Sequence, residues 1–440
     1  MDILIKIAQL FLCFTILVGI HELGHFLMAR AFKIRVEKFY IFFDPWFSLF
    51  KFKRGDTEYG LGWLPLGGYV KIAGMIDESM DKEQMKQPVK PDEFRAKPAW
   101  QRLLVMVAGV MMNVLLAIVI YCAVCYTWGD SYFSNQVAKW GYNFNPTAHE
   151  MGFRDGDRFV SIDGEEIDNV MRVQNDLLFT AGGRRVVVER GGEPVTLDIP
   201  FESLLRMRQE KAYEDLFTLR LPFIVDSVSY TSAVEAGLES GDEVVAIDDL
   251  RDADYPRYRD YLQKHKNDKV LLTVRRDGAL IDSLALPVDA EGRIGVTVTN
   301  PYSLRTQYYT FWESIPAGIH KAGKTISSYW DQLKLIVQPK TKMYEELGGF
   351  VAIGSIFPGS WDWHDFWLKT AFLSIILAVM NLLPIPGLAG GHALFTLWEI
   401  ITRRKPSEKF LEVAQYVGLM IILALLVYAN GNDIYRFFIK

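Results

Sequence analysis

The sequence contains few cysteines and few charged residues for its length. Three of its 440 residues are cysteine, 23% are Asp, Glu, Lys or Arg, and the formal net charge is −5. Cys13, Cys122 and Cys125 all lie in apolar segments, so we interpret them as small hydrophobic residues and not as a disulfide framework. The sequence has no long Lys/Arg run, and this argues against a nucleic-acid partner.

Long hydrophobic runs are the main feature of the sequence. Half of the residues are hydrophobic, and a membrane-spanning helix needs about 20 mostly apolar residues. Four segments approach that length, at about Ile3 to Arg30, Leu103 to Trp128, Phe366 to Leu383 and Leu411 to Tyr428. The first segment contains an H-E-L-G-H motif that is too polar for the apolar core of a signal peptide, so we expect this segment to be a retained span. The sequence therefore predicts a polytopic α-helical membrane protein with four transmembrane helices in a lipid bilayer.

Basic residues near the ends of these spans predict their orientation, because Lys/Arg-rich loops stay on the cytosolic side. They follow the first span, precede the second and lie between the third and fourth, at Arg30, Lys33, Arg35, Lys38, Arg95, Lys97, Arg102, Arg403, Arg404, Lys405 and Lys409. We expect both termini and the long 129–363 segment to lie outside the cytosol. In a bacterium this means a multi-pass protein of the inner membrane with a periplasmic central segment.

The central segment contains an internal duplication. Ala148–Gly164 and Ala233–Asp249 share eight of 17 residues at a constant offset of 85. A repeat of this length indicates two tandem domains. The shared pattern A-G-L-x-x-G-D-x-V-x-x-I-D resembles a PDZ domain of the permuted bacterial type, which has an α+β fold. PDZ domains bind extended peptides along a sheet edge, so peptide binding and simple steric spacing are both open functions for these domains.

The H-E-L-G-H motif of the first span, His21 to His25, predicts a metal site. Residues i and i+4 lie on one face of a helix, so both imidazoles are able to reach one metal ion. The intervening Glu22 is suited to act as a general base toward water. Two histidines and a glutamate are costly in an apolar span, which favours a functional role over simple helix packing. The spacing is typical of zinc, whose catalytic sites use three protein ligands and one open position.

A second motif, N-L-L-P-I-P-G-L-A-G-G-H at Asn381 to His392, lies at the third span. It resembles the N-x-x-P-x-P-x-L-D-G-G signature of the site-2 protease family of intramembrane zinc metalloproteases. The chain departs from this signature at Ala389, where the family carries the aspartate that completes the metal site. The prolines also predict an unwound helix at this point. His392 is an alternative ligand, provided that a change in the position of the helix turns its side chain toward the metal.

Other segments extend the resemblance over essentially the whole chain. G-W-L-P-L-G-G-Y-V-K at Gly62 to Lys71 resembles the membrane-dipping β-hairpin of these proteases, and A-G-V-M-M-N at Ala108 to Asn113 resembles the start of their second span. The order of spans and tandem PDZ domains resembles the regulator-of-sigma-E type of the family. On this basis the chain divides into a first span with HExxH (1–31), a cytosolic segment with the β-hairpin and a loop (32–99), a second span (100–128), two PDZ domains (129–215 and 216–300), an amphipathic helical segment (301–363), a third span with the NxxPxP motif (364–391), and a cytosolic loop with the fourth span (392–440).

The resemblance implies peptide-bond hydrolysis inside the membrane. Zn²⁺ would be bound by His21, His25 and the residue at position 389, with Glu22 as the catalytic base. Gly67, Gly68, Tyr69 and Asn381 would bind an unwound substrate strand. The implied substrates are single-span membrane proteins already trimmed on the periplasmic side, such as anti-sigma factors, and remnant signal peptides.

Position 389 leaves the activity of this particular chain open. The retained residues around Ala389 favour a single introduced replacement of aspartate that impairs catalysis. The first alternative is a natural pseudo-protease, a membrane-anchored PDZ adaptor without catalysis. A metal transporter is the second alternative, but it would need more intramembrane carboxylates than Glu22.

Overall fold

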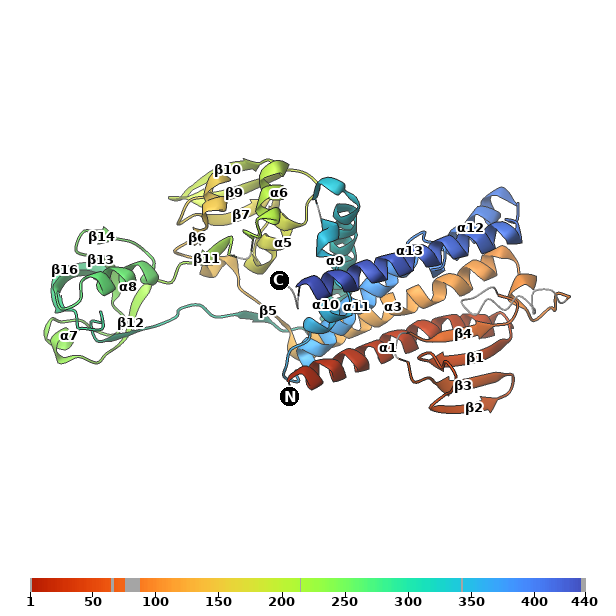
Figure 1. The fold of residues 1–440 in the computed structure, drawn as a ribbon. Coiled ribbons are helices and arrows are strands. Elements are labelled where there is room, and N and C mark those ends of the chain that lie inside the picture. Colours follow the sequence, from red (N-terminus) through yellow and green to blue (C-terminus); the bar gives the residue numbers. More distant parts are fainter. Residues whose placement is uncertain (1, 65–66, 76–87, 214, 342, 437–440) are drawn as a thin grey trace. The chain divides into compact units, whose positions relative to one another are not determined.

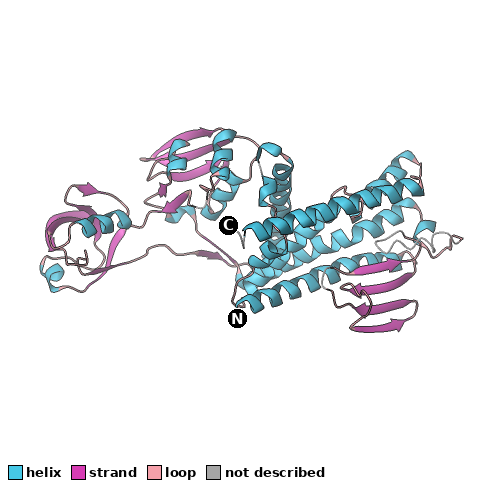
Figure 2. Ribbon diagram, viewed as in Figure 1, coloured by secondary structure: helices cyan, strands magenta, loops and turns pink. Residues whose placement is uncertain are grey.

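The chain forms two compact units in a computed structural model that describes residues 2–64, 67–75, 88–213, 215–341 and 343–436. One unit combines Met1–Gly129 with Tyr308–Lys440, and the other is Asp130–Gln307. The first is a helical bundle with one small sheet, whereas the second is rich in strands (Figures 1 and 2). Pro65 and Leu66 of the predicted hairpin motif, and residues 76–87 of the loop after it, lie outside the described residues.

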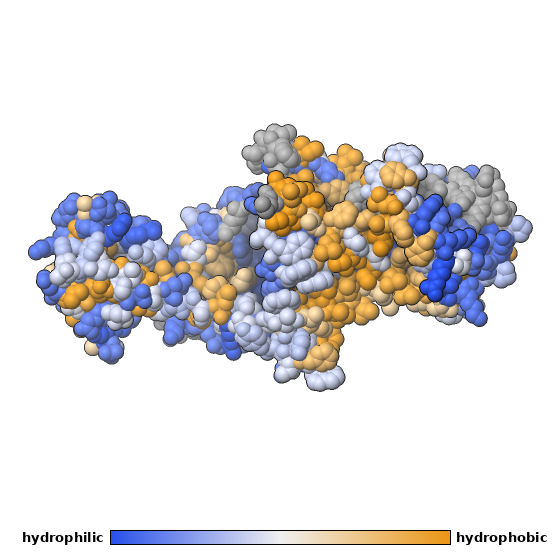
Figure 3. All heavy atoms as spheres, turned by 90° about the horizontal axis from the view of Figure 1, so that it is seen from below, coloured by the Kyte–Doolittle hydropathy of each residue, from blue (hydrophilic) through white to orange (hydrophobic). Residues whose placement is uncertain are grey.

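Four helices in the described part of the chain are long and apolar enough to cross a membrane, which confirms the four-span prediction. They are α1 (Asp2–Ala31), α3 (Ala99–Trp128), α11 (Trp363–Leu382) and α13 (Glu408–Ile434). Helix α3 begins before the apolar run that predicted it, directly after Pro98, which has an extended conformation at the N-cap. Hydrophobic residues cover much of this unit's surface in Figure 3, as expected for a lipid-facing surface.

Helix α3 is the centre of the helical unit, because it packs against α1, α11, α9 (Phe311–Val337) and α12 (Ala389–Thr402). Small residues permit close approach at two of these contacts. A Cβ on Gly24 of α1 would lie 2.5 Å from the carbonyl oxygen of Ala108, and one on Gly318 of α9 would lie 2.5 Å from Cys122 Sγ. Such small-residue contacts are typical of helix packing in membranes. They bring the motif-bearing turn of α1 directly onto α3.

The polypeptide unwinds between α11 and α12, as the two prolines predicted. Helix α11 ends at Leu382, Pro384 and Pro386 follow without helical structure, and α12 begins at Ala389. Gly418 of α13 packs directly against this break, since a Cβ on Gly418 would lie 1.3 Å from the carbonyl oxygen of Pro386. The break therefore packs against another helix, which is the condition under which irregular backbone is tolerated at membrane depth.

The segment after the first span is a four-stranded sheet, and the predicted hairpin is wrong in its pairing. The order is β2-β3-β1-β4, from β1 (Val36–Ile41), β2 (Phe50–Arg54), β3 (Thr57–Leu61) and β4 (Tyr69–Ile72). Strands β3 and β4 flank the Gly-rich motif but do not pair with each other, because β1 lies between them, parallel to β3 and antiparallel to β4. The local hairpin is instead β2–β3, which turns at Gly55 with a φ of +64°.

The segment before the third span contains one 27-residue helix, α9. Ser314, Gly318 and Ala322 form its buried stripe, whereas Trp312 and Trp330 are exposed. The helix therefore packs through small residues and leaves large apolar side chains exposed, so the predicted amphipathic segment stays a prediction. Short helices follow it, namely η4 (Pro339–Thr341), η5 (Met343–Glu346) and α10 (Phe350–Ser355).

The second unit contains two subdomains that share one order of elements, apart from an extra helix, α6, in the first. The first has the sheet β10-β9-β7-β8 and the pair β11-β6, and the second has β16-β15-β13-β12-β17 with β14 on β13. The first subdomain consists of β6 (Tyr142–Phe144), α4 (Pro146–Glu150), β7 (Arg158–Ile162), β8 (Glu165–Glu166), α5 (Val173–Leu178), β9 (Arg184–Arg190), β10 (Glu193–Ile199), α6 (Phe201–Gln209) and β11 (Phe217–Leu219). The second consists of β12 (Phe223–Val228), α7 (Thr231–Glu235), β13 (Glu243–Ile247), β14 (Leu250–Arg251), α8 (Tyr255–Lys264), β15 (Lys269–Arg276), β16 (Ala279–Pro287) and β17 (Val296–Val298). The strands β5 (Asp130–Tyr132) and β18 (Arg305–Gln307) pair at the two ends of the unit.

The duplication extends to individual hydrogen bonds. In the first subdomain Arg190 donates to both carboxylate oxygens of Asp157, at 2.7 Å each, and to the carbonyl of Gly152. In the second, Arg276 makes the same three contacts with Asp242, at 2.6 and 2.7 Å, and with Gly237. Each subdomain also has its own hydrophobic core. The repeat found in the sequence is therefore a repeat of structure.

Candidate metal and catalytic site

The two motif histidines lie side by side on α1, one helical turn apart. Their Nε2 atoms are 3.3 Å apart and the ring planes are nearly perpendicular, at 77°. His21 is 9% exposed, and both imidazoles contact α3. Two imidazole nitrogens this close, on one face of a helix, are a suitable pair of ligands for one metal ion.

Helix α3 supports both rings. The carbonyl of Val105 lies 2.8 Å from Nδ1 of His25, and the side-chain amide of Asn113 lies 3.2 Å from Nδ1 of His21. Gly109 lies between these two residues, and a Cβ there would be 2.4 Å from His25 Nε2 and 2.8 Å from His21 Nε2. The ring edges that bear Nδ1 are thus held by α3, and glycine at position 109 leaves room for the Nε2 edges.

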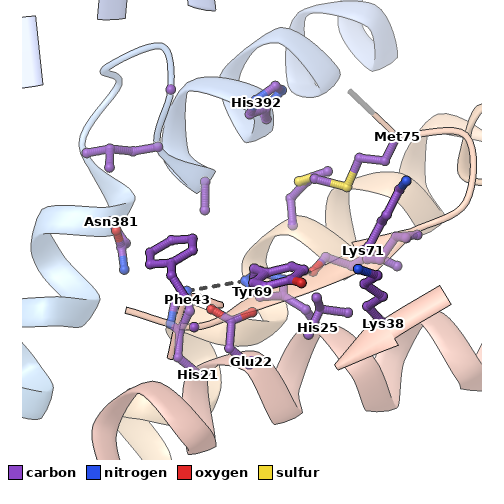
Figure 4. A pocket seen from close by; sticks show the side chains of 18 of the residues that line it. His21, Glu22, His25, Lys38, Phe43, Tyr69, Lys71, Met75, Asn381 and His392 are labelled. Atoms are coloured by element: carbon purple, nitrogen blue, oxygen red, sulfur yellow. Dashed lines mark hydrogen bonds between the residues drawn. The ribbon is translucent and has the colours of Figure 1, made fainter. Parts of the chain in front are cut away.

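A cavity of about 640 Å³ opens at these histidines (Figure 4). It joins residues that are far apart in the sequence: the HExxH turn of α1, the sheet, the break after α11 and the start of α12. The residues predicted for the site that line it are His21, Glu22, His25, Gly68, Tyr69, Asn381 and Ala389. His392 and Gln415 line it as well. Gly67 is next to the cavity in sequence, but it is not one of the residues that line it.

Gly68 brings the sheet onto the helical turn that carries Glu22. A Cβ at this position would lie 2.8 Å from Val18 Cγ1, 2.7 Å from the carbonyl oxygen of Tyr40 and 3.3 Å from Glu22 Cγ. Any larger residue would therefore push the strand away from α1. This contact gives a physical reason for glycine in the predicted motif and sets β4 at the side of Glu22.

Tyr69, the first residue of β4, is held by stacking and by one hydrogen bond. Its ring stacks on Tyr40 and on Phe43, with centroids 5.3 and 5.9 Å away, and its hydroxyl donates to Asp44 Oδ1 at 2.9 Å. Burial and then the hydrogen bond to Asp44 raise the pKa of Tyr69, so the phenol stays protonated. Among the described residues β4 pairs with β1 alone, which makes it an edge strand beside the cavity.

The residues of the cavity fit a zinc site at two of the three protein ligands. In the described part of the chain, no group of three or more His, Cys, Asp or Glu side chains is arranged to hold a metal ion. His21 and His25 supply two nitrogens, and position 389 lies in the same cavity but carries a methyl group. The side chain of His392 also lies in the cavity, on the next turn of α12 (Figure 4). The missing ligand is therefore the anionic one.

Sequence reasoning missed the contributions of Gly109, Asn113 and Gln415. Asn113 gave a signal, since it is a polar residue in an otherwise apolar span, and such residues are functional by default. Its partner His21 is 92 residues away, so no local pattern links the two. Gln415 is likewise a polar residue in an apolar span, the fourth, and it lines the cavity.

Comparison with known proteins shows the family to which this sequence belongs. The model of peptidase family M50 matches residues 9–425. A protein of Clostridium perfringens named "Putative zinc metalloprotease CPE1693" is 30% identical over 427 residues, which cover 96% of both chains. "Regulator of sigma E protease" of Haemophilus influenzae is 27% identical over 460 residues, covering 99% of this chain and all of the relative.

These matches run through both histidine-bearing and proline-bearing segments, so they cover every element that lines the cavity. The matches and the four apolar helices show a member of a membrane-embedded protease family, and the names of the relatives give Zn²⁺ as the cofactor. The chain belongs to peptidase family M50, the site-2 protease family of zinc metalloproteases.

Proposed function

We propose that the cavity is a site for hydrolysing peptide bonds of single-span membrane proteins within the membrane, and that Ala389 impairs it in this chain. The observation that carries the proposal is the common cavity of His21, Glu22, His25 and position 389 at a membrane-spanning helix. An aspartate at 389 would supply an anionic ligand where two imidazoles already converge. With alanine there, the two neutral imidazoles alone should bind zinc weakly.

The residues of the cavity have distinct roles in this proposal. His21 and His25 would hold Zn²⁺ together with an aspartate at position 389, and a bound zinc ion would supply Lewis acidity to the site. Glu22 takes the proton of the attacking water and delivers it to the leaving amine. The water oxygen forms the new C–O bond as the C–N bond breaks, so the products are a carboxylic acid and an amine, which ionise to carboxylate and ammonium.

The substrate must present an extended backbone to this chemistry, because a helix has no free amide groups in its interior. The edge strand β4 at Gly68 and Tyr69 is suited to bind an extended segment by strand addition. Asn381, at the end of α11, lines the cavity and offers an amide for the same backbone. Gly67 would act only through the conformation of the turn, where its φ is +145°.

Cleavage of a model single-span substrate tests this proposal. The chain as it stands should be inactive or strongly impaired, and Ala389→Asp should restore cleavage. Glu22→Gln in the Ala389→Asp background is the matched control, since it retains the shape of the base and removes its basicity. Equal inactivity of this chain and of the Ala389→Asp form would favour the second candidate, a membrane-anchored adaptor without catalysis, which the alanine itself supports.

We further propose that the two repeated subdomains are permuted PDZ domains, and that the second one binds extended peptides. In the second, a hollow of about 340 Å³ lies between α8 and the edge strand β17, lined by Tyr255, Arg259, Leu262, Gly292 and Ile294 among others. A free strand edge beside a helix suits strand addition.

The first subdomain differs at the corresponding position. The inserted helix α6 packs near α5: Arg208 donates to the carbonyls of Leu178 and Thr180, and Gln174 of α5 donates to the carbonyl of Tyr213. Leu204 and Met207 share a core with Leu177 and Leu178. The chain itself thus covers the outer side of α5, which favours the second subdomain for peptide binding.

The proposed location is the bacterial inner membrane, with both termini and the 130–307 unit in the periplasm, as the basic loops predict. The proposed substrates are anti-sigma-factor-type proteins and remnant signal peptides after periplasmic trimming, by the resemblance to the regulator-of-sigma-E type. A cysteine introduced at Asn267 should react with a membrane-impermeant thiol reagent before the inner membrane is permeabilised. Reaction only after permeabilisation would reverse the topology.

A further inference from the structure

The histidines of the metal site have different partners at Nδ1. The partner of His25 is the backbone carbonyl of Val105, at 2.8 Å. A carbonyl only accepts, so the proton of the neutral His25 ring is on Nδ1 and its Nε2 lone pair is available toward the cavity. A metal-binding imidazole needs this tautomer when it binds through Nε2.

The side chain of Asn113 is a partner of His21 at Nδ1, beside the backbone of Gly109, and this side chain is able to serve either tautomer. Asn113 is fully buried, its Nδ2 lies 3.2 Å from His21 Nδ1, and its Oδ1 has no hydrogen-bond partner among the described residues. In this orientation the amide donates to Nδ1. The ring proton of His21 then lies on Nε2, where it points toward Nε2 of His25 and blocks the lone pair that a metal would use.

A half-turn of the amide about χ2 exchanges its nitrogen and oxygen. Oδ1 would then accept a proton from Nδ1–H of His21, which leaves the Nε2 lone pair free. The same turn gives the unpaired Oδ1 a partner in exchange for the one that Nδ2 loses, so the buried side chain keeps one contact with His21 in either orientation. We propose that Asn113 is a positioning residue that sets the tautomer of His21 and, by presenting Oδ1 to Nδ1, prepares it to bind zinc.

The surroundings of Asn113 allow the amide to turn while the backbone stays in place. Ser374 Oγ of α11 donates to the backbone carbonyl of Asn113 at 2.8 Å, so this residue is tied to a second helix independently of its side chain. The amide needs only to rotate about its own bond. Gly109, four residues earlier on α3, leaves the Nε2 side of the ring open.

This inference rests on the proposed zinc site, and the test uses zinc affinity measured by chelator competition on the purified full-length Ala389→Asp protein. Asn113→Leu retains the approximate shape of the side chain but removes the acceptor, and zinc affinity should fall by about 10–100-fold, as for other outer partners of metal-binding histidines. Asn113→Asp only accepts and should restore affinity to within about threefold of Asn113. Ser374→Ala leaves the amide in place and should bind zinc as tightly as the Ala389→Asp protein.

Unchanged zinc affinity in Asn113→Leu would overturn the inference, and so would equal weakening in Asn113→Leu and Asn113→Asp, which would indicate a packing role. Absence of zinc binding in the Ala389→Asp protein itself would instead overturn the proposed function. A second measurement needs no substitution at position 113. Imidazole ¹⁵N resonances of the zinc-free Ala389→Asp protein, assigned with His21→Gln, should show neutral His21 protonated at Nδ1, and protonation at Nε2 would refute the role of Asn113.

Discussion

At the scale of single residues, the site depends on glycines as much as on ligands. Gly24, Gly68 and Gly109 each stand where a Cβ would meet a backbone carbonyl, a neighbouring side chain or a metal-site imidazole within 3 Å. The histidines and the glutamate were predictable from their spacing. Gly68 was also predicted, from its motif, but Gly24 and Gly109 were not, because their requirement comes from contacts between segments distant in the sequence.

Gly109 gives a prediction at this scale. In the Ala389→Asp background, Gly109→Ala should weaken zinc binding at least tenfold, because the new methyl group would lie 2.4 Å from His25 Nε2. Alanine favours the helix, by about 1 kcal/mol over glycine, so the fold should be retained. Zinc content after dialysis against a weak chelator is the measurement. Gly323→Ala in α9 is the control, since a Cβ there has no neighbour within 4 Å; equal zinc content in both variants would contradict the prediction.

At the scale of elements, the sequence predicted what local patterns determine. Uninterrupted apolar length predicted the four spans, and Pro384 and Pro386 predicted the break between α11 and α12. The predicted hairpin was wrong in its pairing, because β3 pairs with β1 in parallel and β2 lies between these two strands in the sequence. Parallel pairing of this kind depends on tertiary contacts, which a turn motif does not encode.

The second repeated subdomain gives a prediction at the scale of elements, centred on the pair of Asp242 and Arg276. Burial alone would raise the pKa of Asp242, but the hydrogen bonds from Arg276 and from the backbone N–H of Glu239 lower it overall, below 3.8. A carboxylate with a lowered folded-state pKa stabilises the fold above its unfolded pKa, and this contribution is lost as the pH falls through the folded value. The pair should therefore contribute fully at neutral pH and vanish in strong acid.

Asp242→Asn should lower the free energy of unfolding of this subdomain by about 2 kcal/mol at pH 7. The value is below that of a fully buried pair because the Arg276 side chain is 25% exposed. Hydrogen exchange of residues 223–298 in the full chain measures it. Asp260→Asn is the control, since Asp260 pairs with Arg259 at the surface at 3.8 Å. A loss in Asp242→Asn no larger than in the control would show that the pair is not needed.

At the scale of the whole molecule, a β-rich unit is inserted between two membrane-spanning helices of a protease family member. Such a position suits a filter that excludes substrates with bulky external domains. We predict that deleting residues 145–300 from the Ala389→Asp protein permits cleavage of untrimmed single-span proteins. Cleavage of untrimmed and trimmed substrates is compared by gel shift, with the intact Ala389→Asp protein as reference. A continued need for trimming after the deletion would refute the filter.

We propose that position 389 completes a zinc site whose other ligands are His21 and His25. Its most direct test is the zinc stoichiometry and X-ray absorption spectrum of this chain, of Ala389→Asp and of Ala389→Asn, after equilibration with one equivalent of zinc and a competing chelator. We predict one zinc per Ala389→Asp chain, bound by two imidazole nitrogens and carboxylate oxygen, with much lower occupancy in the other two. Equal occupancy and the same ligand set in all three proteins would show that position 389 is not a zinc ligand.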